Sequence, residues 1–219
     1  MFTESEHYTG PVSEPVPVRQ AQKERTREAI LAAALGLSQD FGFAQLSLRQ
    51  VTRTAGVVPT AFYRHFDSMD EVGLALVEQS FATLRRMIRD AQRDPDIVDN
   101  LIDASADVLL AAVKQNREHF AFVARERLGG SAAVRAAIQH ELELFISELA
   151  LFLARIPQLE QWTPEDVKMI SGTFVRNMVY RAEQVVETPV GRTDLEEEIK
   201  RKARREMRMI VLGFKDWRS

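Results

Sequence analysis

The sequence contains no cysteine among its 219 residues. This absence excludes disulfide bonds, thiolate metal sites and cysteine nucleophiles, and it agrees with a reducing compartment. The chain also lacks a long uncharged apolar stretch that could span a membrane. Its first residues include Glu4, Glu6 and Glu14 but no apolar run, which is unlike a signal peptide. We therefore expect a cytoplasmic protein with no membrane partner, long enough to bury a sizeable core.

Sequence features of enzymes are also missing. His119 and His140 have no acidic residue three positions earlier, so the chain lacks the Glu-x-x-His pairs of di-iron helical bundles. It has no glycine-rich phosphate loop and no arrangement of residues typical of a nucleophile with its base. We therefore predict no catalytic site, no metal site and no cofactor.

Positive charge is concentrated near the N-terminus, although the whole chain has a formal net charge of -3. Residues 19–66 include seven basic and three acidic side chains, whereas the chain from residue 67 onward includes 22 basic and 26 acidic ones. A basic end on an acidic body is typical of a protein that presents one end to DNA. The modest local excess predicts weak binding by one such end, which a pair of ends would compensate.

Residues 47–66 read SLRQVTRTAGVVPTAFYRHF and predict two short helices joined by a tight turn. Ser47 and Gln50 have the spacing of a capping box at the start of the first helix. Gly56 supplies the left-handed residue that ends this helix, and Pro59 suits the first position of the next. The segment therefore has the form of a helix-turn-helix.

The second of these helices has two different faces. At about 100° per residue, Phe62 and Phe66 point inward together, and Thr60 and Arg64 lie on the opposite face. A helix in the DNA major groove needs base-reading groups outside and hydrogen-bond donors on both flanks. We prefer this interpretation over an ordinary polar surface helix. The predicted DNA-binding residues, including a basic ridge on a preceding helix near 21–40, are Lys23, Arg27, Ser47, Arg49, Arg53, Thr60, Ala61, Tyr63, Arg64 and His65. For the ridge itself, a merely solvated face remains an alternative.

This helix-turn-helix, which ends in FYRHF and precedes a new helix, resembles the DNA-binding head of TetR-family transcriptional regulators. Within that family, LSLRQVTRTAGVVPTAFYRHFDSMDEVGLALV is most similar to the FabR and DesT type of repressor of unsaturated fatty acid synthesis. Many relatives carry a phosphate-binding lysine directly after the position of Ser68, where this chain has Met69, a departure that the fatty-acid repressors share. The resemblance implies a homodimer on a palindromic double-stranded DNA operator, with a long-chain acyl-CoA or related acyl thioester as effector.

Helical periodicity continues to the C-terminus without a convincing strand or an internal repeat. We predict an all-α fold of about nine helices, with an N-terminal three-helix helix-turn-helix head and a C-terminal helical body for ligand binding and dimerisation. The expected divisions are a disordered arm at 1–18, the DNA-binding head at 19–67 and the body at 68–219.

Two caps mark helix starts in the body. Ser68 and Glu71 have the spacing of a second capping box, and Ser131 precedes a long helix. That helix is apolar on two faces, so it is either buried centrally or lines a cavity. The resemblance implies that the helices at 164–187 and 194–216 pair with a second subunit, although their apolar stripes would equally close a monomer core.

The resemblance also implies an apolar cavity among the remaining helices. Twelve Phe and seven Met permit an adaptable pocket, although residues of helical apolar stripes more often belong to a plain core. The predicted pocket residues are Phe81, Leu84, Ile88, Ile102, Leu109, Phe120, Arg125, Phe145, Leu149, Phe174 and Met178.

Residues 125–138 read RERLGGSAAVRAAI and are a second patch that resembles the fatty-acid repressors. In one interpretation Arg125, Arg127 or Arg135, with the helix start at Ser131, meets the phosphate-bearing carrier group of an acyl thioester. In the other, the segment is a helix corner with exposed charges. Both interpretations remain open at this point.

Three rival functions are weighed against the acyl-responsive repressor. A TetR-type regulator of a drug efflux system would sense another apolar ligand, but pockets for drug-like cations commonly contain buried acids and the predicted wall has none. An apolar carrier protein would leave the basic head unexplained. A helical-bundle enzyme lacks its ligands, as described above. We therefore predict a DNA-binding repressor that controls fatty acid metabolism.

Overall fold

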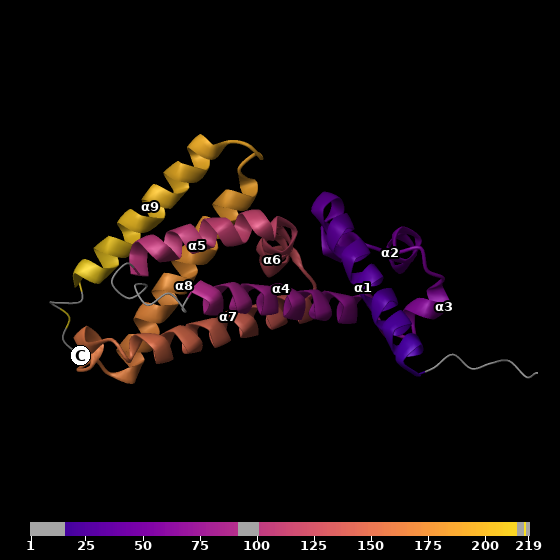
Figure 1. The fold of residues 1–219 in the computed structure, drawn as a ribbon, viewed down its shortest axis with the longest axis horizontal. Coiled ribbons are helices and arrows are strands. Elements are labelled where there is room, and N and C mark those ends of the chain that lie inside the picture. The colour runs from indigo at the N-terminus through magenta and orange to yellow at the C-terminus, as the bar shows by residue number, and fades with distance from the viewer. Residues whose placement is uncertain (1–15, 92–100, 214–216, 218–219) are drawn as a thin grey trace, which may run out of the picture.

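The computed structural model describes residues 16–91, 101–213 and 217, and every regular element in this part of the chain is helical (Figure 1). Nine α-helices and two short 3-10 helices lie in these described ranges, which confirms the predicted all-α fold. The predicted arm at 1–18 falls largely outside the described residues. Its last three residues, however, belong to the first helix, so the arm was predicted too long.

The head consists of two longer and two very short elements. Its first helix begins five residues before the predicted start. Pro17 fits there because backbone N–H groups in the first turn of a helix have no partner within it, so the missing N–H of proline costs no hydrogen bond. The head elements are α1 (Val16–Phe41), η1 (Phe43–Gln45), α2 (Leu48–Thr54) and α3 (Pro59–Phe62).

Six α-helices and one 3-10 helix of the described chain make the body. The sequence also predicts a helix start at Asp94 and Pro95, and both residues lie outside the described ranges. The elements are α4 (Met69–Ala91), α5 (Leu101–Gln115), α6 (Arg117–Gly129), α7 (Ala132–Leu153), η3 (Pro157–Leu159), α8 (Pro164–Glu187) and α9 (Thr193–Leu212).

The body is arranged around α8. Figure 1 shows α4 and α7 running side by side away from the head, while α5 lies beside α9. Helix α8 contacts α5, α6, α7 and α9, and α6 contacts both α1 and η1 of the head. The helices that surround the centre of the body therefore also reach the head.

One apolar core runs from the head into the body. Phe43 and Phe62 of the head belong to the same buried cluster as Leu76, Phe122 and Ile138 of the body. The helices approach so closely that a Cβ atom on Gly73 of α4 would lie 2.7 Å from the Phe43 ring and 2.6 Å from Val134 of α7. A side chain at this glycine would therefore push the head and the body apart. A second cluster, far from the head, joins η3 and the ends of α7, α8 and α9.

The predicted caps are present, with one change. The Ser131 hydroxyl accepts a hydrogen bond from the backbone N–H of Val134 at the start of α7. At the start of α4 the Ser68 hydroxyl accepts from the Glu71 N–H at 3.2 Å, but the Glu71 carboxylate accepts from the N–H of Asp67, not from that of Ser68. The second capping box is therefore only half formed in the predicted way.

Candidate DNA-binding surface and ligand cavity

Local sequence sets the turn between α2 and α3. Both reciprocal hydrogen bonds of the predicted capping box join Ser47 and Gln50 at the start of α2. Gly56 has a φ of 68°, a left-handed conformation that costs glycine little. Val58 then precedes Pro59, which occupies the first turn of α3. This part of the sequence prediction is confirmed.

Helix α3 is shorter than predicted but keeps the predicted faces. Its α-helical part ends at Phe62, and a hydrogen-bonded turn continues it, with the N–H of Phe66 donating to the Phe62 carbonyl at 3.0 Å. Phe62 is fully buried and Phe66 is 2% exposed, with ring centroids 5.8 Å apart. On the other side, Thr60 and Arg64 are exposed.

The remaining predicted DNA-binding residues lie at the surface around α3. Tyr63 is 59% exposed, and its ring meets the Phe62 ring edge-on. The Arg27 guanidinium of α1 lies 5.4 Å from the centre of the Phe66 ring, so the ridge of α1 adjoins α3. Among the other predicted DNA-binding residues, two are half-buried, namely Ala61 and His65, and the exposed ones are Lys23, Ser47, Arg49 and Arg53.

The electrostatics of this surface are positive. Burial lowers the pKa of His65, and the nearby charges of Lys23, Arg27 and Arg64 lower it further. Basic groups of α1 and of the turn after α3 therefore act on one imidazole. All ion pairs found among the described residues involve residues of the body, so no described acid pairs with the cations of the head. Such a surface is suited to an external polyanion.

A cavity of about 580 Å³ lies in the body, with walls from α4, α5, α6, α7, α8 and α9. Its size is within the range of sites for small organic ligands. The side chains of Ile88 and Ile102 lie outside the described residues. Eight predicted pocket residues line the cavity, namely Phe81, Leu84, Leu109, Phe120, Phe145, Leu149, Phe174 and Met178.

The cavity wall also contains charged groups that the prediction missed. Glu148 and Glu183 line the cavity, and each pairs with an arginine. Arg85 binds Glu148 at 3.2 Å and Glu141 at 2.6 Å, and Arg127 binds Glu183. The expectation of a wall without acids was therefore wrong, but both carboxylates are neutralised within the chain.

Arg125 does not line the cavity, so its assignment to the pocket is corrected. Its guanidinium donates to the carbonyls of Ser38 and Gln39 at the end of α1, at 2.6 and 3.0 Å. Next to it, the buried carboxylate of Glu126 accepts from the Phe43 N–H at 2.9 Å. A cation thus meets the carbonyl end of α1 and an anion meets an N–H at the start of η1, as helix termini favour.

The other arginines of the 125–138 patch also bind groups of the protein. Arg127 pairs with Glu183, and Arg135 donates to the carbonyl of Gly130. The patch is a helix corner whose charged groups are engaged internally. This favours the structural interpretation over contact with a phosphate-bearing carrier group.

Two further findings concern metal ions and membranes. No group of three or more His, Asp or Glu side chains that could hold a metal ion occurs in the described parts of the chain. None of the helices described above combines the length and the apolar character needed to cross a membrane.

Comparison with known proteins identifies the head. Residues 30–76 match the family model of bacterial regulatory proteins of the tetR family. This match begins within α1, includes the whole helix-turn-helix and ends in α4. Since the family consists of regulatory proteins, the match does not support the enzyme alternative.

Solved structures share the fold of nearly the whole chain. A TetR-family transcriptional regulator from Syntrophomonas wolfei has a TM-score of 0.70 at 17% identity, with coverage of 88% of this chain and 97% of its own. The fatty acid degradation regulator FadR from Bacillus halodurans has a TM-score of 0.60 at 14% identity, with coverage of 82% and 94%.

AibR, solved in complex with isovaleryl coenzyme A and operator DNA, has a TM-score of 0.62 at 16% identity, with coverage of 87% of this chain and 98% of its own. At these identities the likeness establishes the fold, while the family match concerns the head. Residues 30–76 therefore match the tetR family of bacterial regulatory proteins, and the chain shares the fold of these solved regulators over most of its length.

Proposed function

We propose that this chain is a homodimeric, DNA-binding transcriptional repressor of fatty acid metabolism whose effector is a long-chain acyl-CoA or a related acyl thioester. The observation that carries this proposal is a largely apolar cavity whose walls include α4 and α6, two helices that contact the head. The resemblance to repressors of unsaturated fatty acid synthesis supports the same pathway.

The charge distribution of the cavity suits an amphipathic anion. Its two carboxylates are paired with arginines, as described above, so they offer little attraction to a cationic ligand. Arg89 in the last turn of α4 and Arg155 just after α7 line the cavity, are exposed, and pair with no described residue. Figure 1 places both helix ends away from the head. An acyl chain would fill the apolar cavity, and its phosphate-bearing group would bind these two arginines.

Two neighbours of the same fold agree with this ligand class. FadR is named for fatty acid degradation, and AibR was solved with isovaleryl coenzyme A and operator DNA. Coenzyme A thioesters carry the combination of acyl chain and phosphates that the cavity, Arg89 and Arg155 would accept. The resemblance implies a long acyl chain, and the cavity volume of about 580 Å³ supports this length.

The route from ligand to DNA is short. Helix α4 begins three residues after Phe66 of the helix-turn-helix, and its Ser80, Phe81 and Leu84 line the cavity. Helix α6 contributes Phe120 to the cavity and holds the head through its own C-terminal half. A ligand that prefers one position of these helices by ~1.4 kcal/mol would change DNA affinity by up to about tenfold.

Dimerisation would bring two heads to one palindromic operator, whose half-sites are about 34 Å apart. Large apolar side chains are exposed on the two helices that the resemblance assigns to the dimer, among them Tyr180 of α8 at 52% and Met209 of α9 at 67%. Sedimentation should give a dimer. Glutamate at both positions should produce a monomer that retains helix content, whereas an unchanged dimer would place the interface elsewhere.

The central experiment has two steps. Native mass spectrometry of the purified protein should reveal a copurified acyl lipid. Gel shifts with the operator should then respond to palmitoyl-CoA or palmitoleoyl-CoA, in a direction that the experiment determines. No response to either thioester, together with no bound lipid, would contradict the proposed effector.

A matched pair of variants tests whether the cavity is the binding site. Leu149→Trp places a large ring in the cavity wall and should abolish the acyl-CoA response while DNA binding remains. Leu128→Trp makes the same change at a residue of α6 that is 76% exposed and does not line the cavity, so the response should persist.

A drug-responsive regulator is the second candidate, and Glu148 and Glu183 in the cavity wall are the observation that favours it. Its test is the same gel shift with ethidium as a hydrophobic cation. Release or strengthening of DNA binding by ethidium but not by acyl-CoA would decide for this candidate.

A further inference from the structure

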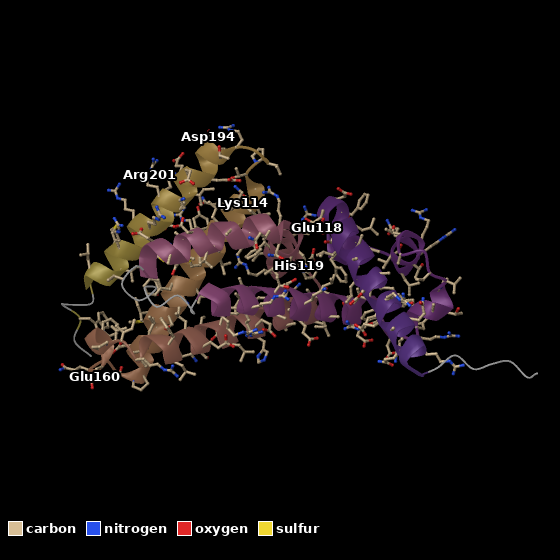
Figure 2. All side chains as sticks on the ribbon, in the orientation of Figure 1. Lys114, Glu118, His119, Glu160, Asp194 and Arg201 are labelled. Carbon is tan, nitrogen blue, oxygen red and sulfur yellow. The ribbon has the colours of Figure 1, made fainter. Side chains whose placement is uncertain are left out.

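A neutral hydrogen-bonding pair interrupts the apolar wall of the cavity. Ser80 of α4 and His119 of α6 both line it, with the Ser80 hydroxyl 2.9 Å from His119 Nδ1. Figure 2 shows His119 on α6, in the region where α4 and α5 pass this helix. Neither residue belongs to the helix-turn-helix.

Hydrogen-bond donors and acceptors determine the tautomer of His119. The Ser80 hydroxyl has one hydrogen, and its oxygen lies 2.7 Å from the carbonyl of Leu76, which can only accept. The hydroxyl hydrogen therefore goes to Leu76. The Ser80 oxygen is left as an acceptor, so His119 Nδ1 must donate to it. This assignment follows from the network and places the proton of a neutral imidazole on Nδ1.

The surroundings of His119 favour the neutral imidazole. Burial lowers the pKa of His119, and the charge of Glu118 opposes this only in part. With Nδ1 protonated, Nε2 carries a lone pair and is an acceptor. No described residue forms a hydrogen bond with Nε2, so this acceptor is available in the cavity wall.

We propose that His119 Nε2 accepts a hydrogen bond from an O–H or N–H group of the effector and thereby selects acyl ligands that carry such a donor. The proposal deepens the proposed function and depends on it for the ligand class. An apolar chain without a donor leaves a buried acceptor unsatisfied, which costs affinity relative to a chain that satisfies it.

The position of the pair favours a hydroxyl on the acyl chain. Arg89 follows Ser80 by nine residues on the same helix, which corresponds to about 13 Å along α4. If the anionic end of the ligand lies at Arg89, His119 meets the chain well away from that end. The other source of a donor is an amide N–H of the pantetheine arm. It would reach His119 in a ligand whose thioester lies further inside the cavity than Arg89.

The test measures displacement of cis-parinaric acid, a fluorescent fatty acid, from the full-length protein. The competitors are stearic acid, 3-hydroxystearic acid, 12-hydroxystearic acid and stearoyl-CoA. Wild-type protein should bind 12-hydroxystearic acid about five- to tenfold more tightly than stearic acid. A different result is that the protein binds stearoyl-CoA more tightly than every free acid and loses this preference in His119→Phe. That result would support the pantetheine amide as the donor.

Three variants assign the preference to His119. His119→Phe keeps a ring of similar shape but removes the acceptor, so stearic and 12-hydroxystearic acid should bind equally. His119→Gln keeps an acceptor and should retain part of the preference, which a merely structural role would not predict. His140→Phe is the matched control, because His140 of α7 is exposed and does not line the cavity.

Failure of the inference and failure of the proposed function give different results. If acyl ligands displace the probe with equal affinity whether or not they carry a donor, the role of His119 is wrong and the acyl effector stands. A donor preference that survives in His119→Phe also overturns the inference. If no acyl ligand displaces the probe from wild-type protein, both the effector class and the inference fall. Circular dichroism of each variant verifies that it is folded.

Discussion

The head and the body use arginine in opposite ways. In the head, Arg49, Arg53 and Arg64 are exposed and form no ion pair with any described residue. In the body, Arg117 donates to the carbonyls of Val186 and Thr188 at the end of α8, and many other arginines bind carboxylates. The same residue type therefore holds helices together in one region and is left for an external partner in the other.

Burial separates the two uses further. Arg181 of α8 is only 5% exposed and binds Glu206 of α9, so its charge is satisfied inside the chain. The cations of the head, by contrast, also repel one another around His65. Such repulsion costs stability unless a partner of opposite charge is bound. The head is thus built for a polyanion, and the body for its own cohesion.

The largest expected effect comes from a substitution in the core of the head, which also tests whether the loss of stability extends to the body. Phe62→Ala removes a fully buried ring from the core that the head and body share, and should cost about 3–5 kcal/mol of folding free energy. DNA binding should be lost. Urea unfolding should be followed by circular dichroism for all helices and by fluorescence of Trp162 and Trp217, which report on the far end of the body.

The two signals distinguish local from global damage. We expect the circular dichroism midpoint to fall more than the tryptophan midpoint, because Trp162 packs in the second core cluster, away from the head. Equal shifts of both midpoints would show that head and body unfold as one unit. Leu128→Ala, at a position that is 76% exposed, is the control for an apolar truncation that removes little packing.

The next largest effect concerns the unpaired arginines. Arg64→Ala should cost about 1–3 kcal/mol of operator affinity and relax base preference, if Arg64 reads a guanine in the major groove. Arg201→Ala removes another exposed arginine, on α9, which Figure 2 shows far from the helix-turn-helix, and should leave binding unchanged. Gel shifts over a series of mutated operators measure both quantities. Unchanged selectivity in the Arg64 variant would contradict a base-reading role.

The sequence was most informative where structure is local. The capping box of Ser47 and Gln50, the left-handed Gly56 and the inward pair of Phe62 and Phe66 each depend on residues within a few positions of one another. Backbone conformation and helical spacing determine such features, so a single sequence suffices to predict them. Helical spacing also supplied candidate cavity residues, but the cavity itself was predicted from the resemblance, because spacing alone does not distinguish a cavity from a core.

The sequence was least informative about the partners of charged residues. Arg125 is 87 positions from Ser38, and Arg127 is 56 positions from Glu183. No local pattern indicates that these arginines bind a helix end and a carboxylate. Arg125 was therefore assigned to the pocket, and Glu183 was missed in its wall. The pair of Ser80 and His119, 39 positions apart, was missed for the same reason.

A smaller effect tests contact with the phosphates. Tyr63→Phe removes a hydroxyl from a residue that is 59% exposed, and should weaken binding to all DNA sequences alike by about 0.5–1.5 kcal/mol, as expected for one lost hydrogen bond. Ser147→Ala removes an exposed hydroxyl from α7 of the body and should have no effect. Affinities for operator and for unrelated DNA measure the outcome. A loss confined to the operator would contradict a phosphate contact.

The smallest expected effect is a pH dependence that originates in the head. Burial and the charges of Lys23, Arg27 and Arg64 keep the pKa of His65 below 6.5, so His65 is mostly neutral at pH 7. Phosphates at the head would attract a proton to His65 and raise its pKa, so binding takes up a proton. DNA affinity should therefore increase as the pH falls below about 6.5.

Folding responds to acid in the opposite direction, which separates the two effects. Because the pKa of His65 is lower in the folded than in the unfolded chain, the unfolded chain binds more protons, and stability should fall as the pH drops below 6.5. Binding titrations at pH 7.5, 6.5 and 5.8 with circular dichroism at each pH measure both. His65→Gln should flatten the binding profile. An identical profile in this variant would exclude His65 as the source of the pH dependence, and would remove the imidazole from the group of head cations that meet DNA.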